Sequence, residues 1–300
     1  MYQCQRILVP LDGSPLAERA LPAAVTLAQA FSQDSPCELH LLRIVPPIVV
    51  AMEPTLYTET IRLGEEEAQA YLAAVAVEWA NSGVPIVPAS ETGSIAESII
   101  TYAQEQAIHL IVISSHGRSG LSRWVYGSVT EKVLRQACCA ILVIREQVEE
   151  VRGVFRKIMV CLDGSPLAEQ VLDPALTLAQ CGQAEVILLR AVQSANLLLD
   201  LETPGYVQEN LTAIERGDAE TYLQHLLERL PDIGSAIITR TVIGPPADAI
   251  IDEAAAEGVD LIAMSSHGRS GLSRWVYGSV TEKVLRGAKC ATLIVRDKNV

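Results

Sequence analysis

The chain has 300 residues, of which 49% are hydrophobic and 20% charged, and its formal net charge is −13. This length favours two domains, and the composition is typical of a globular protein. The negative charge argues against nonspecific binding to nucleic acid or to an anionic membrane. No apolar run reaches the roughly 18 residues of a membrane span. The first residues lack the apolar core of a signal peptide, so we expect a cytoplasmic protein.

The predicted elements of the first half alternate between strands and helices. Short apolar runs predict strands at residues 6–11, 38–45, 84–88, 109–113 and 140–144. Helical spacing of apolar residues predicts helices from Ser14-Pro15 onward, at about 58–81, at 95–107 and at 128–136. This alternation is typical of a parallel, doubly wound α/β sheet with helices on both faces.

The second half repeats this order. Its strands are predicted at residues 157–162, 185–192, 236–242, 260–264 and 291–295. The segment from Ser114 to Arg135 recurs without change from Ser265 to Arg286, and residues 11–18 recur as residues 162–169. We therefore predict two related domains, residues 1–150 and 151–300, joined by a charged linker at 146–153. Unchanged blocks in diverged surroundings indicate that both halves keep one chemical task, with gene conversion as the alternative explanation.

The repeated segment runs from the end of a central strand into a helix. Gly117 and Gly127 are conformationally free positions in this connection, and Ser128 is predicted to cap the helix. The N–H groups at such a helix start suit a phosphate group, and Arg118 adds positive charge. The sequence contains neither a Walker-type loop nor a Gly-x-Gly-x-x-Gly fingerprint after the first strand.

Asp12 and Asp163 lie at the carboxyl ends of the first strands of the two halves. In open α/β sheets the ligand crevice lies outside the carboxyl ends of the strands, where the strand order reverses. If the first and fourth strands flank that reversal, Asp12 and the loop 114–128 face the same crevice. A carboxylate there can accept hydrogen bonds from ribose hydroxyls or from a base amino group. An ordinary Asp-Gly turn is the alternative interpretation.

These segments resemble the universal stress protein family in both halves: Leu-Asp-Gly-Ser after the first strand, then Ser-Ser-His-Gly, then Gly-Ser-Val-Thr-Glu-Lys-Val. The nucleotide-binding branch of that family carries Gly-x-x-Gly, nine residues, and then Gly-Ser/Thr. The matching positions are Ser114, Gly117, Gly127 and Ser128, repeated as Ser265, Gly268, Gly278 and Ser279. Serine replaces the first glycine in both copies. Its Cβ disfavours a close backbone approach or a positive φ, which would lower the affinity.

The resemblance implies a five-stranded sheet in the order 3-2-1-4-5 in each domain, with ATP, ADP or AMP bound to it, with or without Mg²⁺. It implies that Asp12 and Ile44 contact the adenosine and that Gly117, Gly127, Ser128 and Val129 hold the phosphates. Their counterparts are Asp163, Ala191, Gly268, Gly278, Ser279 and Val280, and the cationic candidates are Arg118 and Arg269. The last strands, 140–144 and 291–295, would pair as an intramolecular pseudo-twofold dimer, and a homodimer is also open.

We therefore expect a tandem protein of the stress response that binds nucleotide at two sites and regulates an unidentified protein partner. A slow metal-dependent ATP hydrolase and a nucleotide-free interaction module are the alternatives. No catalytic residue is assigned, because His116 and His267 lack Ser/Asp partners or a paired carboxylate base in the motif. The seven cysteines show no metal-binding spacing and are predicted to be buried reduced thiols.

Overall fold

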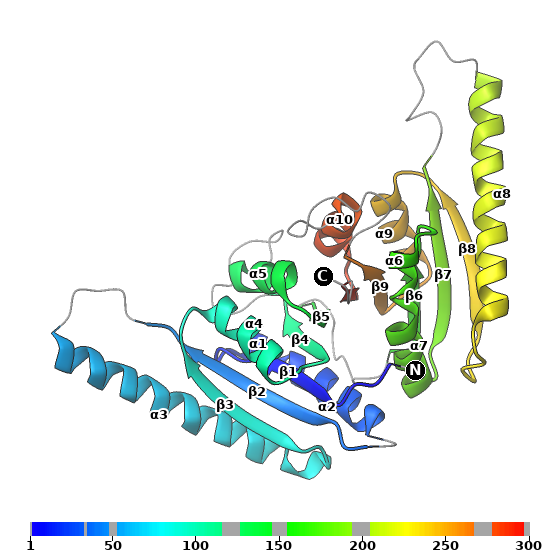
Figure 1. Cartoon of the computed structure of the whole chain (residues 1–300). Helices are drawn as coiled ribbons and strands as arrows, with labels where there is room; N and C mark the ends of the chain where they lie inside the picture. The colour runs from blue at the N-terminus through cyan, green and yellow to red at the C-terminus, as the bar shows by residue number, and fades with distance from the viewer. Residues whose placement is uncertain are drawn as a thin grey trace. The chain divides into compact units, whose positions relative to one another are not determined.

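The computed structural model describes residues 2–32, 35–47, 53–115, 127–145, 155–193, 205–266 and 278–296. The chain divides into two compact units, one of Gln3–Val154 and the other of Met1–Tyr2 with Phe155–Val300. The predicted linker, and the domain boundary within it, lie outside the described residues. Each unit has an α/β fold with its own core (Figure 1).

The first unit follows the predicted alternation. Its elements are β1 (Arg6–Pro10), α1 (Pro15–Glu18), α2 (Ala20–Phe31), β2 (Glu38–Val45), α3 (Pro54–Glu78), the short 3₁₀ helix η1 (Ala80–Ser82), β3 (Ile86–Thr92), α4 (Ile95–Glu105), β4 (Leu110–Ser114), α5 (Ser128–Gln136) and β5 (Ala140–Ile144). The strands pair in parallel in the order β3-β2-β1-β4-β5. This confirms the predicted strand order, and the order in which successive strands are added to the sheet reverses between β1 and β4.

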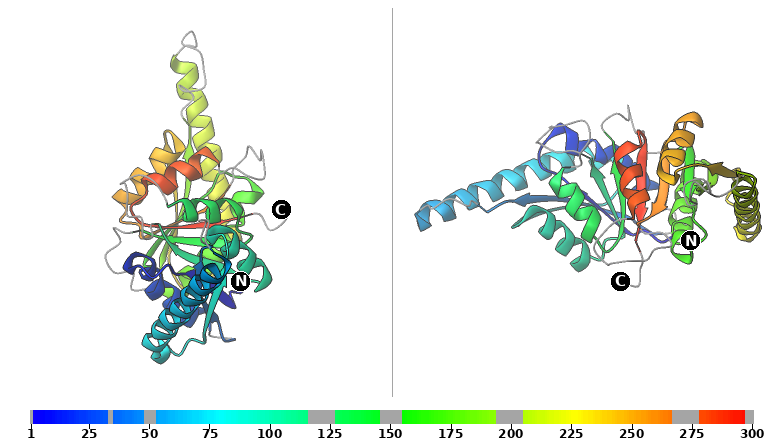
Figure 2. Two further views of the ribbon diagram at one scale, coloured as in Figure 1. Left: turned by 90° about the vertical axis from the view of Figure 1, so that its left-hand side faces the viewer. Right: turned by 90° about the horizontal axis from the view of Figure 1, so that it is seen from above.

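Helices cover both faces of this sheet, as predicted. Helix α2 packs on β1 and β4, and α3 lies along β2 and β3 (Figures 1 and 2). Helix α4 contacts β2 and α5. Strands β4 and β5 are buried along their whole length because they are covered from both sides. This arrangement leaves the carboxyl ends of β1, β2 and β4 at one edge of the sheet.

The second unit repeats the architecture. Its elements are β6 (Lys157–Cys161), α6 (Pro166–Glu169), α7 (Leu172–Gly182), β7 (Glu185–Val192), α8 (Gly205–Arg229), β8 (Ile237–Ile243), α9 (Pro246–Ala256), β9 (Leu261–Ser265), α10 (Ser279–Gly287) and β10 (Ala291–Val295). The parallel order is β8-β7-β6-β9-β10, which is again 3-2-1-4-5 within the unit.

Proline accounts for two of the helix boundaries that differ from the prediction. The first predicted helix is divided at Arg19 into α1 and α2. Pro22 has no N–H to donate to the carbonyl of Glu18, so the helical hydrogen bonding is interrupted there. Helix α3 begins at Pro54, four residues before the expected start. Proline suits the first turn of a helix, where its missing N–H has no intrahelical partner.

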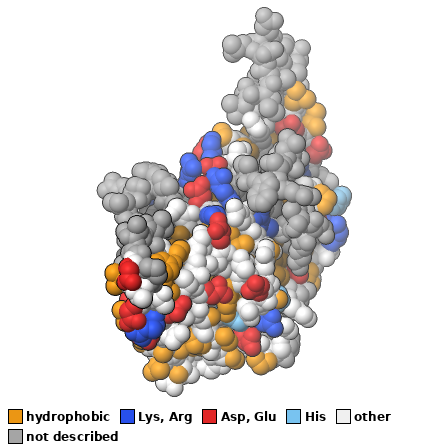
Figure 3. Space-filling view, turned by 60° about the vertical axis from the view of Figure 1, so that its left-hand side comes forward, with side chains coloured by type: hydrophobic (Ala, Val, Ile, Leu, Met, Phe, Trp, Pro, Cys, Tyr) orange, Lys and Arg blue, Asp and Glu red, His pale blue; other side chains and the backbone are white. Residues whose placement is uncertain are grey.

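Acidic and basic side chains of the described residues are interspersed on the face shown in Figure 3. No helix within the described ranges is long and apolar enough to cross a membrane.

All seven cysteines are free thiols. Cys4, Cys37 and Cys161 are buried as predicted, and burial raises the pKa of the Cys161 thiol. The prediction of burial is wrong for Cys138, which is exposed, and Cys139, Cys181 and Cys290 are only half-buried. Cys138 lies in the bend between α5 and β5, outside the packed faces of both elements.

Candidate functional site

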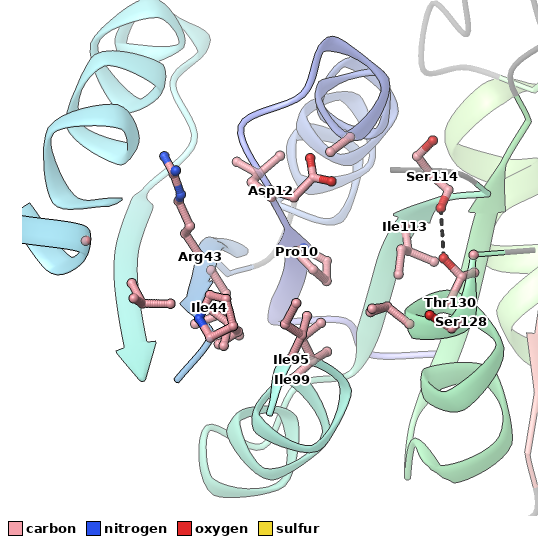
Figure 4. Close-up of a pocket in the computed structure, with 18 of the residues that line it drawn as sticks. Pro10, Asp12, Arg43, Ile44, Ile95, Ile99, Ile113, Ser114, Ser128 and Thr130 are labelled. Atoms are coloured by element: carbon pink, nitrogen blue, oxygen red, sulfur yellow. Dashed lines mark hydrogen bonds between the residues drawn. The ribbon is translucent and has the colours of Figure 1, made fainter. Parts of the chain in front are cut away.

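A cavity of about 490 Å³ lies at the carboxyl edge of the first sheet, between β1, β2, β4, α3, α4 and the start of α5 (Figure 4). Six of the predicted site residues line it: Asp12, Ile44, Ser114, Gly127, Ser128 and Val129. They come together because the carboxyl ends of neighbouring parallel strands meet at one edge. The remaining wall is mostly apolar and includes Ile95 and Ile99 of α4.

Asp12 is held by the turn that follows β1. The backbone N–H and the hydroxyl of Ser14 both donate to Oδ1 of Asp12, at 2.9 and 2.6 Å. The Ser14 hydroxyl oxygen in turn accepts from the N–H of Ala17, at 3.2 Å, and so caps α1. Gly13 supplies the left-handed conformation of the turn, with φ of 82°. The carboxylate therefore has one oxygen fixed by the turn while the group lines the cavity.

The start of α5 forms the opposite side of the cavity. Gly127 is the N-cap, and Ser128 is the first helical residue, so the prediction that Ser128 caps the helix is wrong by one position. The N–H of Gly127 donates to the carbonyl of Ser115, at 3.3 Å, which holds the helix start against the end of β4. Thr130 Oγ1 donates to the carbonyl of Ser114, at 3.2 Å (Figure 4). The first N–H groups of α5 border the cavity at the positive end of the helix dipole.

Ser114 fits its position without backbone strain. It is the last residue of β4, pairs with Ile144 of β5 and is buried. Its φ is not positive. The expected penalty from a left-handed backbone is therefore wrong for this serine, and its side chain lies at the cavity (Figure 4).

Several cavity residues were not predicted from the sequence. Arg43 lies on β2, and Gly64 and Glu67 lie on α3. Arg43 Nη2 donates to Glu67 Oε1 at 2.8 Å, and its guanidinium carbon lies 4.9 Å from the centroid of the Tyr71 ring. Recurrence of the arginine and the tyrosine as Arg190 and Tyr222 was the signal that could have found this pair, whereas Gly64 and Glu67 do not recur as the same residue types.

Tyr71 completes this group by donating its hydroxyl proton to Glu18 Oε1, at 2.7 Å. Burial, followed by the hydrogen bond to Glu18, raises the pKa of the Tyr71 phenol. The phenol therefore stays neutral and acts as a donor at ordinary pH. Through this contact α3 is tied to α1, the helix that follows the Asp12 turn.

The second unit builds the same local geometry. Ser165 donates to Asp163 Oδ1 from its N–H and hydroxyl, at 2.9 and 2.6 Å. Thr281 Oγ1 donates to the Ser265 carbonyl at 3.1 Å. Gly278 is the N-cap of α10, whose first residues are Ser279 and Val280, and Ala191 occupies the Ile44 position on β7. Arg190 lies 5.0 Å from the Tyr222 ring centroid, and Tyr222 donates to Glu169 Oε1 at 3.0 Å.

Some predicted site residues lie outside the described residues. These are Gly117, Arg118, Gly268 and Arg269, together with His116 and His267. The described part of the site thus consists of the Asp12 turn, the β2 wall, the end of β4 and the start of α5, with the equivalent positions in the second unit.

Comparisons with known proteins agree with this architecture. The sequence matches the universal stress protein family over residues 3–145 and 155–296. A universal stress protein of Mycobacterium tuberculosis is 27% identical over 301 residues, covering 97% of this chain and 96% of the relative. One from Bacillus subtilis is 31% identical over 148 residues, covering 48% of this chain and 100% of the relative.

The fold comparison covers the whole chain as well. The crystal structure of a universal stress protein from Archaeoglobus fulgidus matches with a TM-score of 0.73 at 18% identity, over 98% of this chain and 99% of that one. At this identity the likeness concerns the fold alone. The family match over both units carries the assignment: this chain belongs to the universal stress protein family.

Proposed function

We propose that the first unit binds an adenine nucleotide, ATP or its ADP or AMP relatives, in the cavity at the carboxyl edge of its sheet. The observation that carries this proposal is the joining of three surfaces in one cavity: an apolar wall, a carboxylate and a helix start. The base would pack against Ile44, the ribose hydroxyls would donate to Asp12, and the phosphates would meet the N–H groups of Ser128 and Val129.

The size and charge of the site support this assignment. A volume of about 490 Å³ lies within the range of small-molecule sites, and such sites combine an apolar lining with a few placed polar groups. The start of a helix attracts an anion even when the protein as a whole is acidic, because its N–H groups are local and aligned. Any Mg²⁺ would enter with the phosphates.

We extend the proposal to the second unit, because the Asp163 turn and the start of α10 repeat the geometry of the first site. Nucleotide occupancy would then change the surface around the carboxyl edge of each unit. We propose that a protein partner of the stress response reads this change, so that the chain acts as a nucleotide-dependent regulator.

The test is to denature freshly purified protein, to quantify the adenine nucleotide released per chain, and to titrate nucleotide-free protein with ATP and Mg²⁺ by calorimetry. Retained nucleotide or saturable binding supports the proposal. Binding should also slow hydrogen exchange in residues 6–18, which contain the Asp12 turn. No retained nucleotide, no heat of binding and no change in exchange would overturn the proposal in favour of a nucleotide-free interaction module.

A further inference from the structure

We propose that the two sites are not equivalent: the first unit binds the nucleotide more tightly, and the residue at the position of Gly64 sets much of the difference. This inference rests on the proposed function and assigns a specificity role to the helix that follows the second strand of each unit.

Helix α3 approaches β2 closely at Gly64. A Cβ atom at residue 64 would lie only 2.9 Å from Cγ1 of Val45, which is shorter than real Cβ contacts. Glycine therefore permits this approach, and any side chain would require α3 or Val45 to move. Gly64 lines the cavity together with Ile44, Val45 and Glu67, so the approach of α3 closes the cavity on the β2 side.

The equivalent helix of the second unit, α8, has the same register on its strand. Tyr222 lies on Arg190 as Tyr71 lies on Arg43, with centroid distances of 5.0 and 4.9 Å. The alanines three residues before these tyrosines, Ala68 and Ala219, are fully buried. The helix positions of the two units therefore correspond one to one across this contact.

The same register places Glu215 of α8 at the position that Gly64 occupies in α3. Seven residues before Tyr71 is Gly64, and seven residues before Tyr222 is Glu215. Seven residues are about two turns, so each residue lies on the same face of its helix as the tyrosine. The side chain of Glu215 is exposed, whereas Gly64 is partly buried against Val45. The helix position that Gly64 occupies in the first unit thus carries a side chain in the second.

Two differences between the units are then expected to weaken binding at the second site. Ala191 removes the apolar contact that Ile44 offers, and the side chain of Glu215 does not allow the close approach to the strand that Gly64 permits in the first unit. A single missing methylene in an apolar pocket lowers binding by about tenfold or more, so we expect at least about a tenfold difference between the sites.

The experiment is calorimetric titration of the full chain with ATP and Mg²⁺. The native protein should show two classes of site that differ at least about tenfold in dissociation constant. The I44A/G64E double variant should lose the tight class. The reciprocal A191I/E215G variant should gain a second tight site, and this gain cannot arise from misfolding. Val77→Glu, an exposed substitution on α3, is the control and should leave both classes unchanged.

Hydrogen exchange assigns the classes to the units. Peptides over residues 6–18 and 157–169 differ in sequence and report on the two Asp turns separately. Protection should appear first in residues 6–18 as ATP is added. Equal affinities, or protection that appears first in residues 157–169, would overturn the inference and leave the proposed function standing. No binding at either unit would overturn both.

Discussion

The guanidinium group of Arg43 lies against the ring of Tyr71, with 4.9 Å between the guanidinium carbon and the ring centroid. The guanidinium group also lies near the turn after β1, where a Cβ atom at Gly13 would lie 3.5 Å from Arg43 Nη1. The same contacts recur between Arg190, Tyr222 and Gly164 in the second unit. The arginine therefore links the helix after the second strand to the turn that carries the site aspartate.

Arg43→Lys should weaken both the fold and the site of the first unit. Lysine keeps the charge but loses the planar group that stacks on Tyr71 and covers Gly13. We expect the free energy of unfolding to fall by about 1 kcal/mol, since Arg43 is only 14% exposed at its side chain. Urea denaturation measures this loss, and calorimetry should show a several-fold weaker tight site. Glu67→Gln, which keeps the stack, should lower stability less, and equal losses would contradict the role of stacking.

Substitutions of Asp12 should distinguish its role in the turn from its role in binding the nucleotide. Asp12→Asn keeps an oxygen that can accept from Ser14, so the turn and the thermal stability should be nearly unchanged. It replaces the second carboxylate oxygen with an amide, so the affinity of the first unit for nucleotide should fall about tenfold. Asp12→Ala loses both roles and should also lower stability by about 1 kcal/mol. Unchanged nucleotide affinity in Asp12→Asn would show that Asp12 serves the turn alone.

Gly127→Ser tests whether phosphate approaches the start of α5. A Cβ atom at this residue would meet no atom of the described residues within 4 Å, and its φ of −55° is open to any residue. Serine is also a good N-cap, so the stability of the unliganded protein should stay within about 0.5 kcal/mol of the native value. Nucleotide affinity at the first site should nevertheless fall, because the side chain would occupy the space of the phosphates. Normal nucleotide binding by this variant would show that the phosphates lie elsewhere.

The sequence was sufficient for the parts of the site that follow from topology. Asp12, Ile44 and Ser114 end neighbouring parallel strands, and such ends must meet once the strand order is 3-2-1-4-5. The duplicated segment located the start of α5 to within one residue. Whether Gly127 or Ser128 is the N-cap depends on backbone angles that either residue could adopt. The predicted pairing of residues 140–144 with residues 291–295 stays a prediction.

The part of the cavity wall that Gly64 and Glu67 of α3 form could not be predicted from the sequence. It depends on the distance between α3 and β2, whose contacting residues lie about twenty residues apart in the chain. From the sequence alone, Gly64 is an unfavourable residue inside a helix, and its purpose becomes clear only from its approach to Val45. Glu67 reads as part of a solvated acidic run, and its contact with Arg43 depends on the same packing. Exposure of Cys138 likewise depends on the bend after α5, which apolar periodicity does not define.

His40 offers a test of the first core that is independent of nucleotide. It is 3% exposed, and its Nδ1 lies 2.8 Å from the hydroxyl of Tyr102. Burial lowers the pKa of His40; Arg6 adds to this, and nearby Glu38 opposes it in part. The folded state therefore keeps the imidazole neutral to lower pH than the unfolded chain does.

The sign of the pH effect follows from this difference. As pH falls below about 6.5, the unfolded chain takes up a proton at His40 before the folded unit does, so folding stability falls with pH in this window. Above about pH 6.5 the contribution of the neutral His40 to folding stability is fully present. His40→Gln keeps a hydrogen-bonding group for Tyr102 but cannot titrate in this range, so its stability should change less between about pH 7.5 and pH 5.5. Urea denaturation at both pH values measures the change. An equal loss in native and variant proteins would assign the pH dependence to groups other than His40.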